Sequence, residues 1–144
     1  MNDAAATKIH WTFWLITNFY MAWNILGVLN LVNQFNSDVV ASFPESHQAI
    51  IVDRPIWATL GSAIAVFAGS LSSLLLLFRK KSALQYFYTS LFGVILTMIH
   101  TVRALEASSG FSLVDTLTML VMPLLLAAVM IWYAKTTMSK GWVV

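Results

Sequence analysis

The chain has no cysteine and few charged residues. The absence of cysteine from its 144 residues excludes disulfides, thiolate metal sites, iron–sulfur clusters and cysteine nucleophiles. Only 10% of the residues are charged, whereas soluble domains carry about a quarter. Because 59% of the residues are hydrophobic and the mean hydropathy is +0.78, the composition indicates a membrane protein with no separate soluble domain.

The sequence patterns of common enzymes are also missing. There is no Gly-x-Ser-x-Gly elbow, phosphate-binding loop or dinucleotide fingerprint. The three histidines, His10, His47 and His100, show no paired spacing such as i and i+4, so a metal or haem site is not expected. The net charge of +2 comes from residues near span ends, and these form no footprint for nucleic acid. We expect no catalysis, no cofactor and no nucleic-acid partner.

Four long apolar runs predict four membrane-spanning helices. Their expected ranges are residues 11–32, 56–78, 84–102 and 113–134. Between the first two spans, Ser42 and Glu45 have the spacing of a capping box and predict a short amphipathic helix over residues 43–53, stopped before Pro55. The predicted fold is an all-α integral membrane protein, a four-helix transmembrane bundle in which residues 1–144 form one domain.

The distribution of basic residues predicts the orientation in the bilayer. Two of the eight basic residues, Arg54 and Arg103, fall on one side of the spans together with five acidic residues. The other side holds one acidic residue, Asp3, and six basic residues: Lys8, Arg79, Lys80, Lys81, Lys135 and Lys140. Because basic loops stay in the cytoplasm, both termini are expected there, with the first span retained rather than cleaved as a signal peptide.

The second span carries a face of small residues at spacings of three and four. Small side chains let helix backbones approach closely, which drives helix association in lipid. The pattern predicts a packing interface, either with another span of the same chain or with a neighbouring subunit. The residues of this small-residue face are Ala58, Ser62, Ala65, Gly69 and Ser72.

Several polar residues lie within or beside the spans and are candidates for a solute site. Asn24 and Asn30 share one face of the first span with Gly27, and buried amides must face other helices rather than lipid. A second group is expected at the outer span ends: Trp57, His100, Arg103, Glu106 and Asp115. Ionisable groups in spans mark functional sites by default.

A purely structural interpretation of the same residues also stands. In it, Arg103 extends to the membrane surface, Glu106 pairs with Arg103 or Arg54, and His100 bonds a neighbouring carbonyl. Pro123, in the middle of the fourth span, is expected to bend that helix.

The chain resembles a group of short bacterial four-span membrane proteins. The similar segments cover residues 10–14, 23–27, 55–57, 63–69, 77–80, 132–134 and 140–142. They include His10-Trp11-Thr12-Phe13-Trp14 and Trp23-Asn24-Ile25-Leu26-Gly27. The resemblance implies the inner membrane of a bacterium, and some proteins of the group carry an automatic label as sugar transporters.

Two function classes follow. The first is a non-enzymatic accessory or self-associating subunit of a membrane complex, with the small-residue face as its interface. The second is a small-solute, possibly sugar, transporter or channel, with Asn24, Asn30, His100 and Arg103 lining a polar site on the outer side. A cavity-facing Asn24 favours transport, whereas a fully packed Asn24 favours the structural class.

Overall fold

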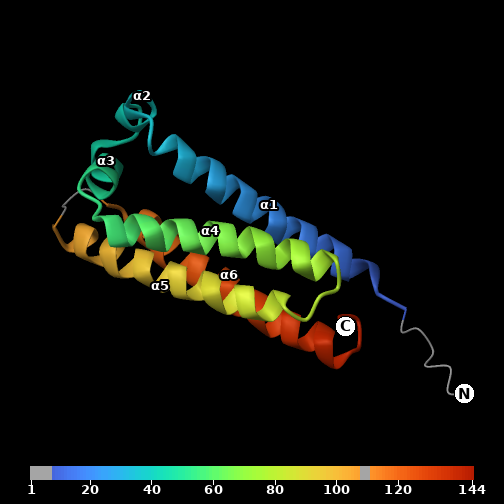
Figure 1. Ribbon diagram of the computed structural model, residues 1–144. Coiled ribbons are helices and arrows are strands. Elements are labelled where there is room, and N and C mark those ends of the chain that lie inside the picture. The colour runs from blue at the N-terminus through green and yellow to red at the C-terminus, as the bar shows by residue number, and fades with distance from the viewer. Residues whose placement is uncertain (1–7, 108–110) are drawn as a thin grey trace, which may run out of the picture.

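The computed structural model describes residues 8–107 and 111–144, and six helices form in this part of the chain (Figure 1). They are α1 (Trp11–Asn33), α2 (Ser37–Ala41), α3 (Glu45–Val52), α4 (Ile56–Leu77), α5 (Ala83–Ala107) and α6 (Leu113–Ser139). Four of them have 22 to 27 residues and are apolar enough to cross a membrane. At about 1.5 Å per residue, each exceeds the ~30 Å hydrocarbon core. The predicted four-helix transmembrane bundle is confirmed.

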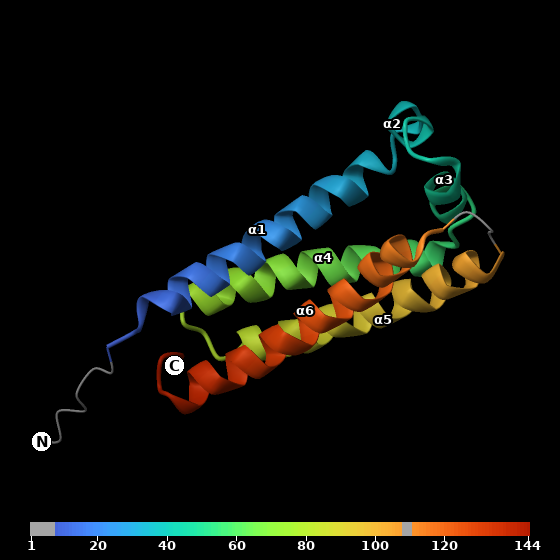
Figure 2. The ribbon, with the colours of Figure 1, turned by 180° about the vertical axis from the view of Figure 1, so that it is seen from behind.

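The four long helices run along one another, with α4 between α1 and α5 and with α6 packed on α5 (Figures 1 and 2). The short helices α2 and α3 lie at one end of the bundle, here called the connector end. The start of α1 and the end of α6 lie at the opposite end, here called the terminal end. Towards the connector end, α1 diverges from its neighbours (Figure 2).

The contact between α4 and α5 is the most extensive in the bundle. The backbones approach closely at Gly93, because a Cβ added there would overlap the backbone nitrogen of Ala65 and would lie 2.6 Å from the Gly61 carbonyl oxygen. Ser90 reinforces this contact by donating from its Oγ to the Ala65 carbonyl oxygen at 2.6 Å. Backbone-to-backbone contact of this kind is how small residues hold helices together in lipid.

The small-residue face of the second span packs inside the chain. Ala65 contacts α5, and a Cβ added at Gly69 would overlap the side-chain oxygen of Asn24 on α1. Ala58 and Ser72 are also buried. Of the two kinds of partner expected for this face, the structure shows spans of the same chain, because α1 and α5 contact it.

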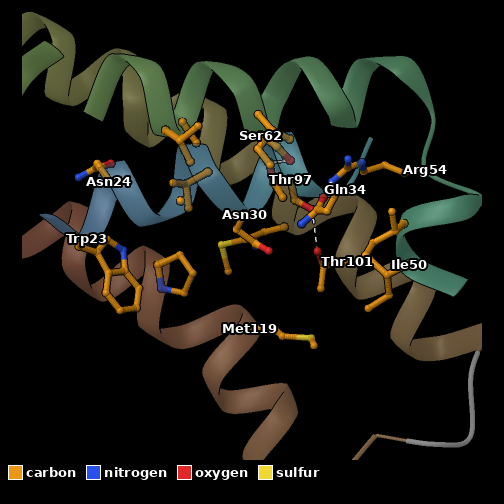
Figure 3. A pocket seen from close by; sticks show the side chains of 18 of the residues that line it. Trp23, Asn24, Asn30, Gln34, Ile50, Arg54, Ser62, Thr97, Thr101 and Met119 are labelled. Carbon is orange, nitrogen blue, oxygen red and sulfur yellow. Dashed lines mark hydrogen bonds between the residues drawn. The ribbon is translucent and has the colours of Figure 1, made fainter. Parts of the chain in front are cut away.

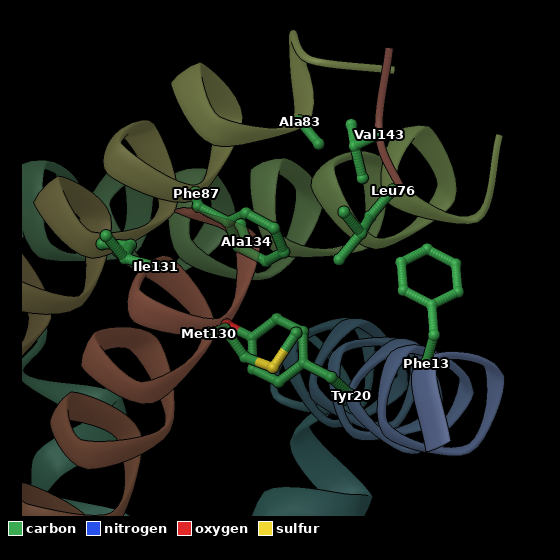
Figure 4. Packing of buried hydrophobic residues seen from close by; sticks show 9 residues of the cluster. All are labelled: Phe13, Tyr20, Leu76, Ala83, Phe87, Met130, Ile131, Ala134 and Val143. Carbon is green, nitrogen blue, oxygen red and sulfur yellow. The ribbon is translucent and has the colours of Figure 1, made fainter. Parts of the chain in front are cut away.

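A hydrophobic core fills the terminal half of the bundle (Figure 4). All four long helices and the C-terminal segment contribute to it: Phe13, Tyr20, Leu76, Ala83, Phe87, Met130, Ile131, Ala134 and Val143. The aromatic rings of Tyr20 and Phe87 meet here with their centroids 5.7 Å apart. Large side chains from opposite helices therefore close this half of the bundle.

The C-terminal segment folds back onto the turn between α4 and α5. Gly141 reverses the chain after α6 with a φ of 68°, a conformation in which glycine has no steric penalty. Arg79 then donates from its Nε to the Trp142 carbonyl oxygen at 2.7 Å. The backbone nitrogen of Val144 donates to the Arg79 carbonyl oxygen at 2.8 Å. These bonds hold Val143 inside the terminal core.

The connector between the first two spans differs in detail from the prediction. Ser42 does not cap α3; it ends α2, an unpredicted helix, and donates from its Oγ to the Val39 carbonyl oxygen at 2.6 Å. Pro44 instead precedes α3, and its carbonyl oxygen accepts bonds from the backbone nitrogens of His47 and Gln48. Because the residue before a proline is disfavoured in the helical conformation, Phe43 does not join the helix, which begins after Pro44, at Glu45.

The last two long helices extend beyond their predicted ends. α5 continues to Ala107 and α6 to Ser139, because residues outside the apolar runs remain helical. A capping box does occur at the start of α6. Ser112 Oγ accepts from the Asp115 backbone nitrogen, and Asp115 Oδ2 accepts from the Ser112 backbone nitrogen, both at 3.1 Å.

Candidate functional site

A cavity of about 540 Å³ lies in the connector half of the bundle (Figure 3). Its walls come from α1, α4, α5 and α6, and α3 lies across its end. Pockets that bind small molecules measure about 300–1,000 Å³, so the space suits an organic ligand. The polar residues on its wall are Tyr20, Asn24, Asn30, Gln34, His47, Arg54, Ser62, Ser90, Thr97 and Thr101.

The cavity exists because α1 and α6 separate where α4 and α5 remain tightly packed. α1 contacts α4 and α6 contacts α5, and the extensive helix contacts of the described residues include none between α1 and α6. Gly27 and Ala65 lie on the cavity wall, and neither has a large side chain to extend into the space. Pro123 lies within α6 and faces this space.

Asn24 lies on the cavity wall, close to the terminal core, and also packs against α4. Its side chain is only 5% exposed, and Nδ2 donates to the Tyr20 carbonyl oxygen at 2.8 Å. Its Oδ1 lies against Gly69, which has no side chain to displace it. Asn24 thus meets both expectations in part: it lines the cavity and it contributes to packing.

Asn30 and Gln34 follow Asn24 along the same side of α1, at successive levels towards the connector end. The Asn30 amide projects into the middle of the cavity (Figure 3). Gln34 is the residue that follows α1, and its Oε1 accepts a hydrogen bond from Arg54 Nη1 at 2.7 Å. One side of α1 therefore presents amide groups along the length of the cavity.

Arg54 joins the connector to two long helices. It donates from Nη1 to Gln34 beside α1 and from Nε to Thr59 Oγ1 on α4, the latter at 3.2 Å. Burial lowers the pKa of the Arg54 guanidinium from its usual value, yet an arginine keeps its charge at neutral pH. The cavity therefore has a positive group at its connector end.

Hydroxyl groups line the wall between α4 and α5. Ser62 Oγ and Thr97 Oγ1 lie 3.2 Å apart, and each also contacts a backbone carbonyl oxygen of its own helix. Thr101 donates from Oγ1 to the Thr97 carbonyl oxygen at 3.0 Å. Because these hydrogens are used within the protein, the hydroxyl oxygens face the cavity chiefly as acceptors.

His100 and Trp57 do not line the cavity, and His100 bonds α3. His100 is 8% exposed, and its Nε2 lies 3.0 Å from the Ile50 carbonyl oxygen of α3. Because a carbonyl can only accept, this nitrogen carries the hydrogen. Trp57 meets the His100 ring edge to face at 6.2 Å. The histidine thus bonds a neighbouring carbonyl, which was the structural interpretation of its role.

The remaining predicted site residues do not reach the cavity. Arg103 and Glu106 are exposed on α5, and Arg103 borders a shallow apolar groove between α5 and α6, which shares Met98 with the cavity. Asp115 is used in the capping box of α6. Within residues 8–107 and 111–144, no ion pair joins Glu106 to Arg103 or Arg54. The predicted outer cluster is therefore dispersed over different faces of the helices.

Sequence reasoning passed over the hydroxyl wall and the role of Gln34. Thr97 and Thr101 recur at a helical spacing of four inside an apolar run, which was the available signal for an inward polar stripe. Gln34 gave no such signal, because its role depends on Arg54, twenty residues further along the chain.

Neither a metal cluster nor a known relative points to a function. The described residues contain no group of three or more His, Asp or Glu side chains that could hold a metal ion. The chain matches no protein-family model, no curated protein and no solved structure.

Proposed function

We propose that the protein is a small-solute carrier of the membrane that binds its solute in the cavity beneath α3. The observation that supports this most strongly is the cavity itself, which extends from the connector end to Asn24 and has amide groups along one wall. A packed structural bundle has no need for such a space, because void space forfeits packing contacts.

The two halves of the bundle are consistent with access from one side. The terminal core fills the path beyond Asn24 with large side chains, among them Tyr20, Phe87 and Met130. A carrier closed on one side and open on the other exposes its solute to one compartment at a time. In this proposal the structure corresponds to the state that is closed at the terminal end.

We further propose that the membrane is the inner membrane of a bacterium, with both termini in the cytoplasm and the cavity opening outward. Six basic residues at the terminal end support this orientation. The resemblance to short bacterial four-span proteins supports the location. The protein would act by binding and moving a solute, without catalysing a reaction on it.

A second candidate function is that of an accessory or self-associating subunit in a larger membrane complex. The small-residue face is covered, so association would need another surface. The apolar groove between α5 and α6 offers one, with Arg103 and five apolar residues: Ile95, Met98, Ile99, Val102 and Leu124. The observation that favours this candidate is the exposure of apolar side chains there, because Ile95, Ile99, Val102 and Leu124 are each about 40% exposed.

A matched pair of variants on α1 tests the carrier proposal. Asn30→Trp places a large ring in the cavity, whereas Asn33→Trp adds the same ring to the exposed end of the same helix, outside it. Purified protein would be tested against a panel of small solutes by thermal shift, and stabilising solutes by uptake into proteoliposomes. The proposal expects Asn30→Trp to abolish both responses and Asn33→Trp to retain them.

Two results would contradict the carrier proposal. One is a solute response that Asn30→Trp leaves unchanged, which would locate binding elsewhere. The other is a stoichiometric foreign protein recovered from native membranes together with no uptake of any solute, which would favour the accessory subunit.

A further inference from the structure

The charge on the cavity wall has only one sign. Arg54 contributes a positive charge, and the described residues that line the cavity include no aspartate or glutamate. The other titratable lining groups are Tyr20 and His47, and His47 contacts Ser46 Oγ at 3.3 Å and the ring of Phe111 at 5.5 Å. A partly buried guanidinium without an acidic partner favours an anion from outside the protein.

Arg54 retains free donors for such an anion. A guanidinium has five N–H groups, and the hydrogen bonds with Gln34 and Thr59 use one on Nη1 and one on Nε. Both acceptors are neutral, so they hold the planar group in position without cancelling its charge. Two parallel N–H groups of an arginine match the two oxygens of a carboxylate.

The rest of the cavity suits an apolar body. Val66, Val94, Met98, Met119 and Leu126 contribute to its walls. The hydroxyl hydrogens on the α4–α5 wall are already used within the protein, so few donors remain there for a ligand with many hydroxyl groups. On this wall a sugar would find acceptors but few donors for its own hydroxyl oxygens, and the amide donors of the cavity lie on the α1 side.

We propose that the ligand of this cavity is an organic monoanion with an apolar body, whose carboxylate is bound by Arg54 beside Gln34. This inference rests on the proposed function, because it names the chemical class of the solute. Two sources have the same chemistry: a medium-chain fatty acid that comes from the bilayer, and a water-soluble aromatic acid.

Photo-crosslinking of the full chain tests the inference. The protein would be placed in nanodiscs of zwitterionic phosphatidylcholine and labelled at pH 8 with decanoate that carries a diazirine near its tail. We expect label on peptides that contain residues 94–101 and 119–126. Unlabelled decanoate should compete for this label, whereas decanol, which has the same tail without the charge, should not.

Three arginine variants assign the selectivity to one side chain. Arg54→Gln should lower the labelling about tenfold or more, since a charge-assisted bidentate contact is lost. Arg54→Lys should give an intermediate level, because the positive charge remains but the bidentate contact is lost. Arg103→Gln is the matched control, because Arg103 is an arginine that borders the α5–α6 groove and does not line the cavity. It should label like the unmodified protein.

The outcomes separate this inference from the proposed function. If decanol competes as well as decanoate, or if Arg54→Gln labels at the unmodified level, the anion inference is overturned. In that case, if the diazirine label still maps to the cavity and Asn30→Trp blocks it, the carrier proposal is retained. If the label maps only to lipid-facing residues such as Phe92 and Asn30→Trp does not change it, both are overturned.

The competition arm also identifies the source of the ligand. Competition by decanoate but not by benzoate supports a ligand from the bilayer, and competition by both supports a soluble acid. Because the preference for decanoate over decanol is measured on the unmodified protein, the inference remains testable even if Arg54→Gln fails to fold.

Discussion

The same four helices build two different halves of this bundle. In the terminal half, Phe13, Leu76 and Phe87 are almost fully buried, and the C-terminal segment adds Val143 to them. In the connector half, the inward residues of α1 and α6 line an open cavity. The α4–α5 contact spans both halves, so the difference comes from the two outer helices.

The interactions that hold the two halves differ as well. In the terminal half, large side chains pack together, and hydrogen bonds with Arg79 hold the C-terminal segment against them. In the connector half, single polar contacts join segments that packing leaves apart: Arg54 with Gln34, and His100 with Ile50. Ligand-binding regions are drawn from the less stable parts of proteins. The comparison therefore predicts that substitutions in the terminal half lower stability, whereas substitutions in the connector half impair binding.

The largest effect is expected from Gly93→Ala. The added Cβ would lie 2.6 Å from the Gly61 carbonyl oxygen and would overlap the Ala65 backbone nitrogen, and neither backbone atom can rotate away. α4 and α5 must then move apart, at a cost of about 3 kcal/mol or more in the free energy of unfolding. Unfolding in mixed micelles, followed by circular dichroism, measures this.

Gly27→Ala is the matched control for that substitution. Its Cβ would meet only the side chain of Val66, at 2.9 Å, and Val66 borders the cavity and has room to move. We expect a loss below about 1 kcal/mol. An equal loss from both substitutions would mean that the connector half is as tightly packed as the α4–α5 contact, which would contradict the comparison.

Two methionines on α6 test the difference between the halves directly. Met130 is 3% exposed in the terminal core, whereas Met119 is half-buried on the cavity wall. Methionine-to-alanine changes in soluble cores cost about 2–5 kcal/mol. In a micelle part of the transfer term is absent, so Met130→Ala should cost about 2 kcal/mol.

Met119→Ala should cost less than about 0.5 kcal/mol, because its side chain already faces open space. The same unfolding experiment compares both variants. If Met119→Ala is the more destabilising of the two, the cavity is filled in the membrane. The contrast between a packed terminal half and an open connector half is then wrong.

The parts of this molecule that sequence could predict are those that depend on local pattern. Four apolar runs specified four spans, and the spacing of three between Asn24, Gly27 and Asn30 placed these residues on one face, which does line the cavity. The small-residue pattern of the second span indicated close helix contact, but its partner depended on the arrangement of the whole bundle.

The predicted outer cluster shows where such reasoning ends. Topology brings His100, Arg103 and Glu106 to the same end of the bundle, and they were expected to converge there. A shared end and a spacing of three do not guarantee convergence: His100 contacts α3, whereas Arg103 and Glu106 lie about one and two turns further along α5 and are exposed. Pro44 similarly displaced the start of α3 through a backbone effect that the capping-box pattern did not include.

A smaller and more local effect is expected from His100→Ala. Loss of the bond between Nε2 and the Ile50 carbonyl oxygen should loosen α3. The amides of residues 45–52 should exchange about tenfold faster, as expected for the loss of one buried hydrogen bond. Hydrogen exchange measured by mass spectrometry gives this rate, and His100→Gln, which retains a donor, should restore part of the protection.

Faster exchange throughout all four long helices of His100→Ala would contradict this local role. It would mean that the histidine stabilises the whole bundle rather than the position of α3. Unchanged exchange would instead mean that the ties of Arg54 to Gln34 and Thr59 hold α3 without help from His100.

The smallest effect is expected from Arg103→Gln and Glu106→Gln, alone or together. Both side chains are exposed on α5, outside the cavity, and an exposed pair at this spacing would contribute at most about 0.5 kcal/mol. Stability, hydrogen exchange of α3 and photo-labelling should therefore all match the unmodified protein. If Arg103→Gln reduced labelling by decanoate as much as Arg54→Gln, the anion would reach α5 as well. The functional surface would then extend around that helix, and the contrast between a filled terminal half and a single pocket in the connector half would no longer describe the site.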